Sequence, residues 1–170
     1  MWLSLSRIFA VIFISAALIG CESVDDDRIP PSPVSITFST IGEWELYGVS
    51  GAGQYRRFIF TDSEREPAGY PYKGLDRTGF GGVLLLADPN GQYIAYDLAC
   101  PVEVRSDVRI YVDVDNELAG VGRCPQCGST YNLYVGGQPM GGEALSKSYG
   151  LQRYKVNMSG GVGNYASITR

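Results

Sequence analysis

Apolar and polar residues alternate along several short segments of this 170-residue chain. Residues 34–39 read Val-Ser-Ile-Thr-Phe-Ser, which is the period of a strand with one buried face. Residues 109–114 alternate in the same way, and residues 152–156 and 165–169 are further strand candidates. After residue 20 we find no convincing helical period. The pattern therefore predicts an all-β chain built from short strands.

The clearest predicted hairpin joins residues 83–87 to residues 92–96. Between them stands Asn90-Gly91, a strong turn dipeptide because both residues tolerate positive φ. Residues 44–47 and 58–60 are short apolar patches between glycine-rich turns, and residues 61–79 have the composition of a loop. The 22 glycines fit many short strands joined by tight turns. We therefore expect antiparallel sheets.

The first twenty residues predict a signal peptide. Arg7 is the only charge before an apolar run over residues 8–19, which leads into Leu-Ile-Gly and Cys21. The run is shorter than the ~20 residues that a comfortable membrane span needs. Leu-Ile-Gly-Cys resembles a bacterial lipobox, which implies cleavage before Cys21 and lipidation of its thiol, including a palmitate. An uncleaved anchor or an ordinary secretory signal remains open.

Residues 21–33 predict a lipidated flexible tether. Its first part is acidic, over residues 22–27, and Pro30, Pro31 and Pro33 stiffen the rest. A solvated acidic linker explains the charges. The cluster also resembles the surface-export signals of Bacteroidetes lipoproteins. We therefore expect an outer-membrane lipoprotein, periplasmic or surface-exposed, that acyl chains hold in the membrane.

The net charge and the lack of histidine exclude some classes of function. Removal of residues 1–20 leaves a 150-residue chain with a net charge of −5, which suits one domain over residues 34–170 and argues against nucleic-acid binding. The chain contains no histidine, so Ser–His and Cys–His nucleophilic pairs are impossible. We therefore expect a role without catalysis, with a protein or small-molecule partner that the sequence does not name.

The candidate chemistry lies in two cysteine loops. Cys124-Pro-Gln-Cys127-Gly-Ser is a tight turn that directs two thiols to one place, and Cys100-Pro-Val-Glu103 has the same spacing. Across residues 79–169, the order of hairpin, loop, hairpin, loop and closing strand resembles a small Rieske iron–sulfur domain of the kind found in short Bacteroidetes lipoproteins. The resemblance implies a single Rieske-like domain of antiparallel sheets with a rubredoxin-like loop pair.

The same resemblance implies a damaged cluster site. A Rieske centre holds two irons with two thiolates and two imidazoles. Cys100 and Cys124 match the thiolate ligands, whereas Val102 and Cys127 occupy the histidine positions. With no histidine in the chain, a two-histidine centre within a single chain is excluded. The resemblance thus points to the fold and not to the cluster.

Several uses of the three cysteines remain open. The favoured interpretation is a structural disulfide between two of the thiols, with no cofactor, as is usual in an oxidising compartment. The alternatives are a metal site, in which Cys100, Cys124, Cys127 and the Glu103 carboxylate bind zinc or an iron–sulfur cluster, and thiol–disulfide exchange at Cys124 and Cys127. A site shared between chains is a further alternative.

Two function hypotheses follow. The first is a membrane-anchored, non-catalytic binding or structural module whose Rieske-like fold has lost its cluster. The second is a redox or metal protein, such as a ferredoxin-like electron-transfer component. Both require the Cys100 sulfur to lie within roughly 6 Å of the Cys124 or Cys127 sulfur. Both also place residues 124–127 in a turn between strands.

Overall fold

The protein is described here by a computed structural model of residues 23–116, 119–159 and 165–170. The predicted signal peptide and the predicted lipidation site Cys21 lie outside the described residues. Among the described residues, no helix is long and apolar enough to cross a membrane.

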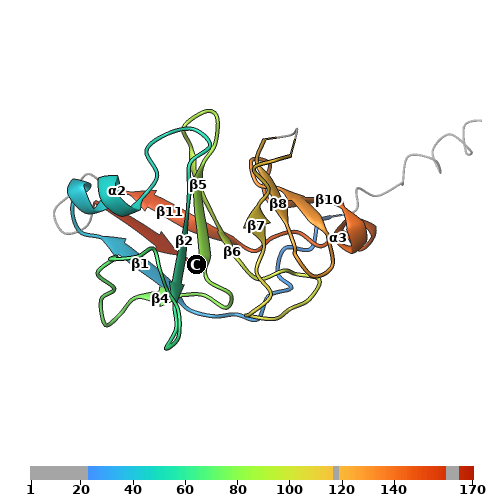
Figure 1. Ribbon diagram of the computed structural model, residues 1–170, viewed down its shortest axis with the longest axis horizontal. Helices are drawn as coiled ribbons and strands as arrows, with labels where there is room; N and C mark the ends of the chain where they lie inside the picture. Colours follow the sequence, from blue (N-terminus) through green and yellow to red (C-terminus); the bar gives the residue numbers. More distant parts are fainter. Residues whose placement is uncertain (1–22, 117–118, 160–164) are drawn as a thin grey trace, which may run out of the picture.

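The strands form two sheets (Figure 1). The first has the order β3-β2-β5-β6-β11-β12-β1-β4, and the second has the order β10-β9-β8-β7. The strands of the first sheet are β1 (Val34–Phe38), β2 (Tyr55–Phe60), β3 (Arg65–Glu66), β4 (Arg77–Thr78), β5 (Val83–Ala87), β6 (Tyr93–Asp97), β11 (Arg153–Met158) and β12 (Ala166–Thr169). Those of the second sheet are β7 (Tyr111–Val112), β8 (Val121–Arg123), β9 (Thr130–Asn132) and β10 (Gln138–Gly141).

All the ladders between these strands are antiparallel. The predicted fold class, an all-β domain of antiparallel sheets, is therefore confirmed. The predicted hairpin is β5 and β6, whose ladder ends at the pair of Ala87 and Tyr93. Gly91 has a φ of +78°, and the Asp88 carboxylate accepts the N–H groups of Asn90 and Gln92. The turn thus forms where the sequence predicts it, with positive φ at Gly91 but not at Asn90.

Strand β5 separates two apolar cores. Its side chains alternate between the two faces of the sheet. Val83 and Leu85 join a first core cluster inside the large sheet, and Leu84 and Leu86 join a second cluster toward the small sheet. All of its residues are buried. The continuous apolar run at residues 83–87 is therefore the signature of a strand that is covered on both faces.

Two short helices differ from the all-strand prediction. Helix α2 (Ile41–Tyr47) contains the patch at residues 44–47 that was expected between turns. The Thr40 side chain accepts the N–H of Glu43, and the Glu43 carboxylate accepts the N–H of Ser39. The sequence carries the Thr-x-x-Glu signature of a capping box, but Glu43 bonds to the N–H of Ser39, one residue before the N-cap Thr40. Helix α3 (Gly142–Ser146) follows strand β10 directly.

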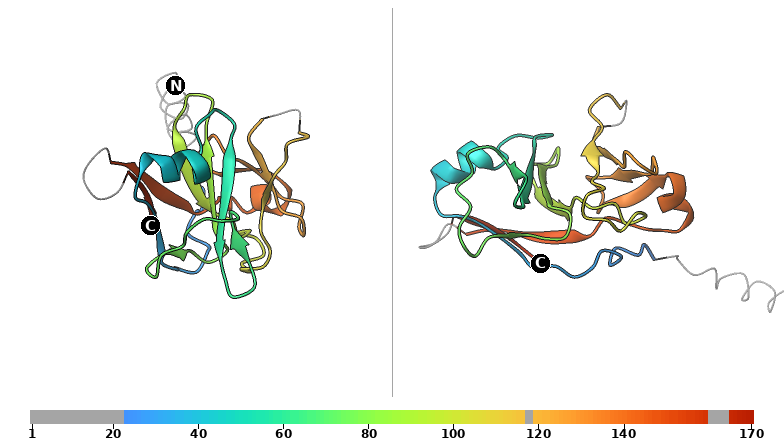
Figure 2. Two further views of the ribbon diagram at one scale, coloured as in Figure 1. Left: turned by 60° about the vertical axis from the view of Figure 1, so that its left-hand side comes forward. Right: turned by 60° about the horizontal axis from the view of Figure 1, so that its bottom comes forward.

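The segment before β1 lies along the domain instead of leaving it (Figure 2). Asp25 forms a bridge with Tyr149, the Arg28 guanidinium lies 4.2 Å from the Tyr149 ring centroid, and Ile29 is buried. A flexible tether was expected up to residue 33. In the structure, any free tether ends before Asp25.

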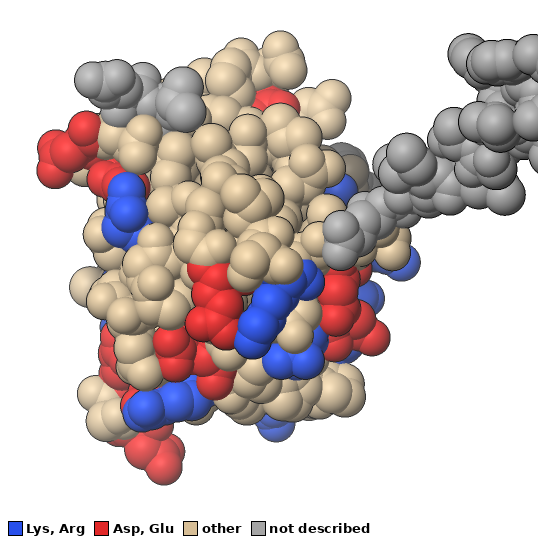
Figure 3. Space-filling model, turned by 90° about the vertical axis from the view of Figure 1, so that its right-hand side faces the viewer, with Lys and Arg blue, Asp and Glu red and all other residues tan. Residues whose placement is uncertain are grey.

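Opposite charges are neighbours on the face at the α3 end (Figure 3). On α3 itself, the Lys147 ammonium lies 2.6 Å from the Glu143 carboxylate, four residues earlier. Such exposed pairs add little to stability, because water screens the two charges. Figure 3 shows basic and acidic groups side by side on this face, not a patch of one sign.

The Asp97 carboxylate links the end of β6 to its surroundings. It is fully buried and accepts the N–H groups of Phe80, Gly81 and Ala99 at 2.7–2.9 Å. The Tyr154 hydroxyl, on β11, donates to the same carboxylate at 2.6 Å. Burial raises the pKa of Asp97, and these hydrogen bonds oppose that rise. Buried polar groups are tolerated when they are bonded in this way.

We predict that Tyr154→Phe destabilises the domain by about 1–3 kcal/mol, because it leaves part of a buried carboxylate without its donor. Urea unfolding followed by circular dichroism measures the loss. Tyr55→Phe, which removes a hydroxyl from an exposed tyrosine, is the matched control and should stay within about 0.5 kcal/mol. Equal stability of both variants would contradict this role of Tyr154.

Candidate thiolate metal site

Three cysteines meet between the two sheets. Cys100 follows β6, Cys124 follows β8, and Cys127 lies in the turn between β8 and β9. Their sulfurs all lie within 4.8 Å of one another, and those of Cys100 and Cys127 are 3.7 Å apart. Both expectations from the sequence are confirmed: the two loops face each other, and residues 124–127 form a turn between strands.

The two loops have matching backbone turns. The Val104 N–H donates to the Cys100 carbonyl at 2.9 Å, and the Gly128 N–H donates to the Cys124 carbonyl at 3.1 Å. Both residues that close these turns have positive φ, +50° for Val104 and +71° for Gly128. Glycine adopts such a φ freely, whereas valine does so at a cost.

Backbone donors point at the sulfurs in the same pattern. The backbone N–H groups of Glu103 and Val102 act to lower the pKa of the Cys100 thiol, and those of Cys127 and Gln126 act to lower that of Cys124, in both cases against the larger effect of burial. In each loop the donors are therefore the second and third residues after the cysteine. This repeated geometry is what a rubredoxin-like loop pair requires.

Side chains complete the surroundings of the sulfurs. The Tyr131 hydroxyl lies 3.4 Å from the Cys100 sulfur, and the Ser129 hydroxyl lies 3.3 Å from the Cys127 sulfur. Ser129 also accepts the N–H of Ala144 at 3.1 Å, which ties α3 to the site. Ser129 ends the second cysteine motif, but the sequence alone assigned neither Ser129 nor Tyr131 to the site.

The three thiols differ in environment. Cys100 and Cys124 are buried, and Cys127 is partly exposed. Burial raises the pKa of the Cys100 thiol and raises the pKa of the Cys124 thiol to about 12. At Cys127 burial acts in the same direction, but hydrogen bonds from Ser129 and from the neighbouring cysteines outweigh it and lower the pKa. Cys127 is therefore the thiol most ready to ionise.

Glu103 does not join the three sulfurs. It is not among the converging ligand groups, and its carboxylate accepts the Gln126 side-chain N–H at 2.8 Å. This bond connects the first cysteine loop to the second. In this structure Glu103 therefore links the loops and does not complete a Cys₃Glu shell. Val102, at a histidine position of the resemblance, packs against the second core cluster.

The spacing of the sulfurs suits a metal ion. Zn–S bonds of ~2.3 Å in a tetrahedron place the sulfurs about 3.8 Å apart. The 3.7 Å between Cys100 and Cys127 matches that edge. A disulfide needs about 2.05 Å, and all three cysteines are free in this structure. The geometry is thus that of a reduced three-thiol site.

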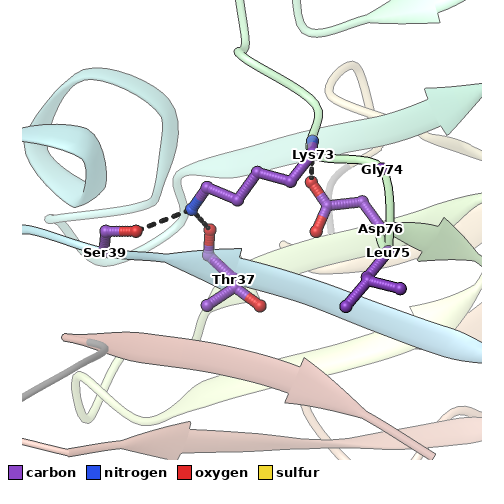
Figure 4. A pocket seen from close by; sticks show the side chains of 6 residues that line it. All are labelled: Thr37, Ser39, Lys73, Gly74, Leu75 and Asp76. Carbon is purple, nitrogen blue, oxygen red and sulfur yellow. Dashed lines mark hydrogen bonds between the residues drawn. The ribbon is translucent and has the colours of Figure 1, made fainter.

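A separate cavity of about 670 Å³ lies over β1 in the first sheet (Figure 4). Its Lys73 ammonium donates to the Thr37 carbonyl and the Ser39 hydroxyl, and it lies 3.5 Å from the Glu43 carboxylate. The Asp76 carboxylate accepts the Lys73 N–H. These polar groups already bond to one another, so the cavity offers no candidate chemistry.

The comparisons with known proteins give little beyond this geometry. No family model matches the chain, and no curated protein matches it. Among solved structures, the chain is similar to the ferredoxin of carbazole 1,9a-dioxygenase from Nocardioides aromaticivorans IC177. The identity is 14% and the TM-score is 0.40, over 80% of this chain and 96% of the ferredoxin. At this level we transfer no property of that ferredoxin.

We predict that iodoacetamide alkylates Cys127 about tenfold faster or more than Cys100 and Cys124 in the metal-free folded protein, because thiolate character and exposure control reactivity. Peptide mass spectrometry after timed quenching at pH 8 gives the three rates. In 8 M urea, the control, the three rates should converge. Faster modification of Cys100 or Cys124 in the folded protein would contradict the burial described here.

Proposed function

We propose that this chain is a metal-thiolate protein of the cell envelope, with a Rieske-like domain that binds one metal ion through Cys100, Cys124 and Cys127. The observation that carries the proposal is the convergence of three sulfurs from two separate loops within 4.8 Å. Thiolates at this spacing bind thiophilic metals such as zinc.

The surroundings of the three sulfurs favour a bound metal over a structural disulfide. A structural disulfide occupies two cysteines and leaves the third without a role. Backbone N–H groups beside Cys124 and Cys100 favour the thiolate, which is the form that binds a metal, but burial outweighs them and keeps the pKa of both thiols raised. A bound cation supplies the positive charge that buried thiolates lack, so all three cysteines can act as ligands once an ion is present.

The cluster of a Rieske centre does not fit these residues. That cluster needs two imidazoles, the chain has no histidine, and Val102 has no donor atom in its side chain. We therefore assign no electron transfer through such a cluster. The Rieske-like description rests on the order of hairpins and cysteine loops along the chain.

The second candidate is a non-catalytic binding or structural module with a Cys100–Cys127 disulfide. The 3.7 Å between these sulfurs favours this pair over the others, because a small shift brings them to bonding distance. Cys124 then remains as a buried thiol.

The proposed location follows from the N-terminal sequence. We propose that acyl chains on Cys21 anchor the protein in the outer membrane, facing the periplasm or the cell surface. The lipobox-like Leu-Ile-Gly-Cys supports this location, and the acidic residues after Cys21 support export to the surface. The membrane would then be its one assigned partner.

Native mass spectrometry of the full chain, purified in detergent without chelator, tests the proposal. We expect a mass increase of about one zinc per chain. A mass about two hydrogens below the reduced sequence, with no metal, would support the disulfide module instead.

Cys124→Ser separates the two candidates, because it removes one metal ligand and leaves Cys100 and Cys127 in place. Under the metal proposal this variant loses the ion. Under the disulfide alternative it keeps the mass of a disulfide. Glu103→Gln is the matched control and should retain the metal, because Glu103 bonds to Gln126 and does not converge with the sulfurs.

A further inference from the structure

The donor set of the cysteine site restricts which ion it prefers. We infer that Cys100, Cys124 and Cys127 form a three-coordinate, all-sulfur site for a soft monovalent cation, Cu(I), and hold it in preference to Zn²⁺. This inference rests on the proposed function and names the ion that the same site selects.

The first argument is the absence of a fourth protein ligand among the described residues. The metal-ligating groups that converge there are the three thiols alone. The chain has no histidine, and the Glu103 carboxylate bonds to Gln126. Structural zinc is almost always held by four ligands. Thiolates bind both Cu(I) and zinc, so it is the lack of a fourth ligand that favours Cu(I). A three-sulfur shell satisfies a soft cation without a further ligand.

The nearest oxygens act as hydrogen-bond partners. The Tyr131 hydroxyl contacts the Cys100 sulfur at 3.4 Å, and the Ser129 hydroxyl contacts the Cys127 sulfur at 3.3 Å. Ser129 already accepts the N–H of Ala144. Neutral hydroxyl groups in these positions donate to thiolates and are weak metal ligands. They surround the sulfurs without adding a hard donor to the shell.

The second argument concerns charge. Three thiolates with Cu(I) carry a net charge of −2, compared with −1 for Zn²⁺, and a buried negative charge must be stabilised by donors. Hydroxyl groups lie beside two of the sulfurs: that of Tyr131 is 3.4 Å from the Cys100 sulfur, and that of Ser129 is 3.3 Å from the Cys127 sulfur. Both hydroxyls can donate to a thiolate, so the site can hold the larger negative charge.

The third argument is the shape of the surroundings. Cys100 and Cys124 belong to the same buried apolar cluster as Leu98, Val108 and Ile110, and Cys127 is partly exposed. An ion therefore enters beside Cys127 and finds apolar packing behind the other two sulfurs. Packing of this kind brings no oxygen or nitrogen ligand to the ion from behind these two sulfurs, which suits a cation that needs only three soft ligands.

The test is a pair of competition titrations on the full chain, reduced and kept anaerobic in detergent. Cu(I) is titrated against bicinchoninate, and Zn²⁺ against a chromophoric zinc chelator. We expect one Cu(I) per chain, with a dissociation constant on the order of a thousandfold below that for Zn²⁺. X-ray absorption of the copper-loaded protein should show sulfur neighbours only, three in number.

Two substitutions and a control sharpen the test. Cys124→Ser and Cys127→Ser should each weaken Cu(I) binding by on the order of a hundredfold or more, because a hydroxyl replaces a soft ligand. Cys127 is partly exposed, so its variant remains informative if the variant at the buried Cys124 fails to fold. Glu103→Gln should leave both affinities unchanged.

Tighter or equal binding of Zn²⁺ would overturn the preference for Cu(I), and so would an oxygen neighbour that Glu103→Gln removes. Either result would leave the proposed metal-thiolate function standing. A reduced chain that binds neither ion would overturn the preference and the proposed function together.

Discussion

The buried carboxylate of Asp97 is the interaction on which the arrangement of the site depends. It holds the N–H groups of Phe80 and Gly81 before β5 and the N–H of Ala99 directly before Cys100. The Tyr154 hydroxyl brings β11 to the same carboxylate. A charged group excluded from water is stable only with such partners. The requirement to satisfy Asp97 therefore fixes where the first cysteine loop begins.

The second cysteine loop is held by helix α3 and by the chain that follows it. Ser129 links Cys127 to the N–H of Ala144 in α3, and the chain after α3 bonds to Asp25 through Ser148 and Gly150. The site thus lies between the first sheet and the small sheet, and the N-terminal segment supports the chain that follows α3. Contacts from distant parts of the chain set the separation of its sulfurs, which is the property that decides between a metal and a disulfide.

Much of the fold could be predicted because its signals are local. The hairpin of β5 and β6 depends on alternation and on one turn, and both are visible in the sequence. Helix α2 has a local signal as well, the Thr-x-x-Glu pattern of Thr40 and Glu43, but its seven residues are too few to show a helical period. The docking of Asp25 and Ile29 on the domain has no local signal, because it depends on partners more than a hundred residues away, such as Tyr149.

The sequence by itself determined which chemistry is available: three cysteines after the lipobox-like motif, no histidine, and two loops of equal spacing. A ligand that is missing from the composition cannot be supplied by folding. Only the tertiary structure decided which donors meet. It brought the Cys100 sulfur to 3.7 Å from the Cys127 sulfur, and it paired Glu103 with Gln126 away from the thiols. Which side chains converge depends on how the two sheets lie relative to each other. The packing of both cores and the burial of Asp97 together fix that arrangement.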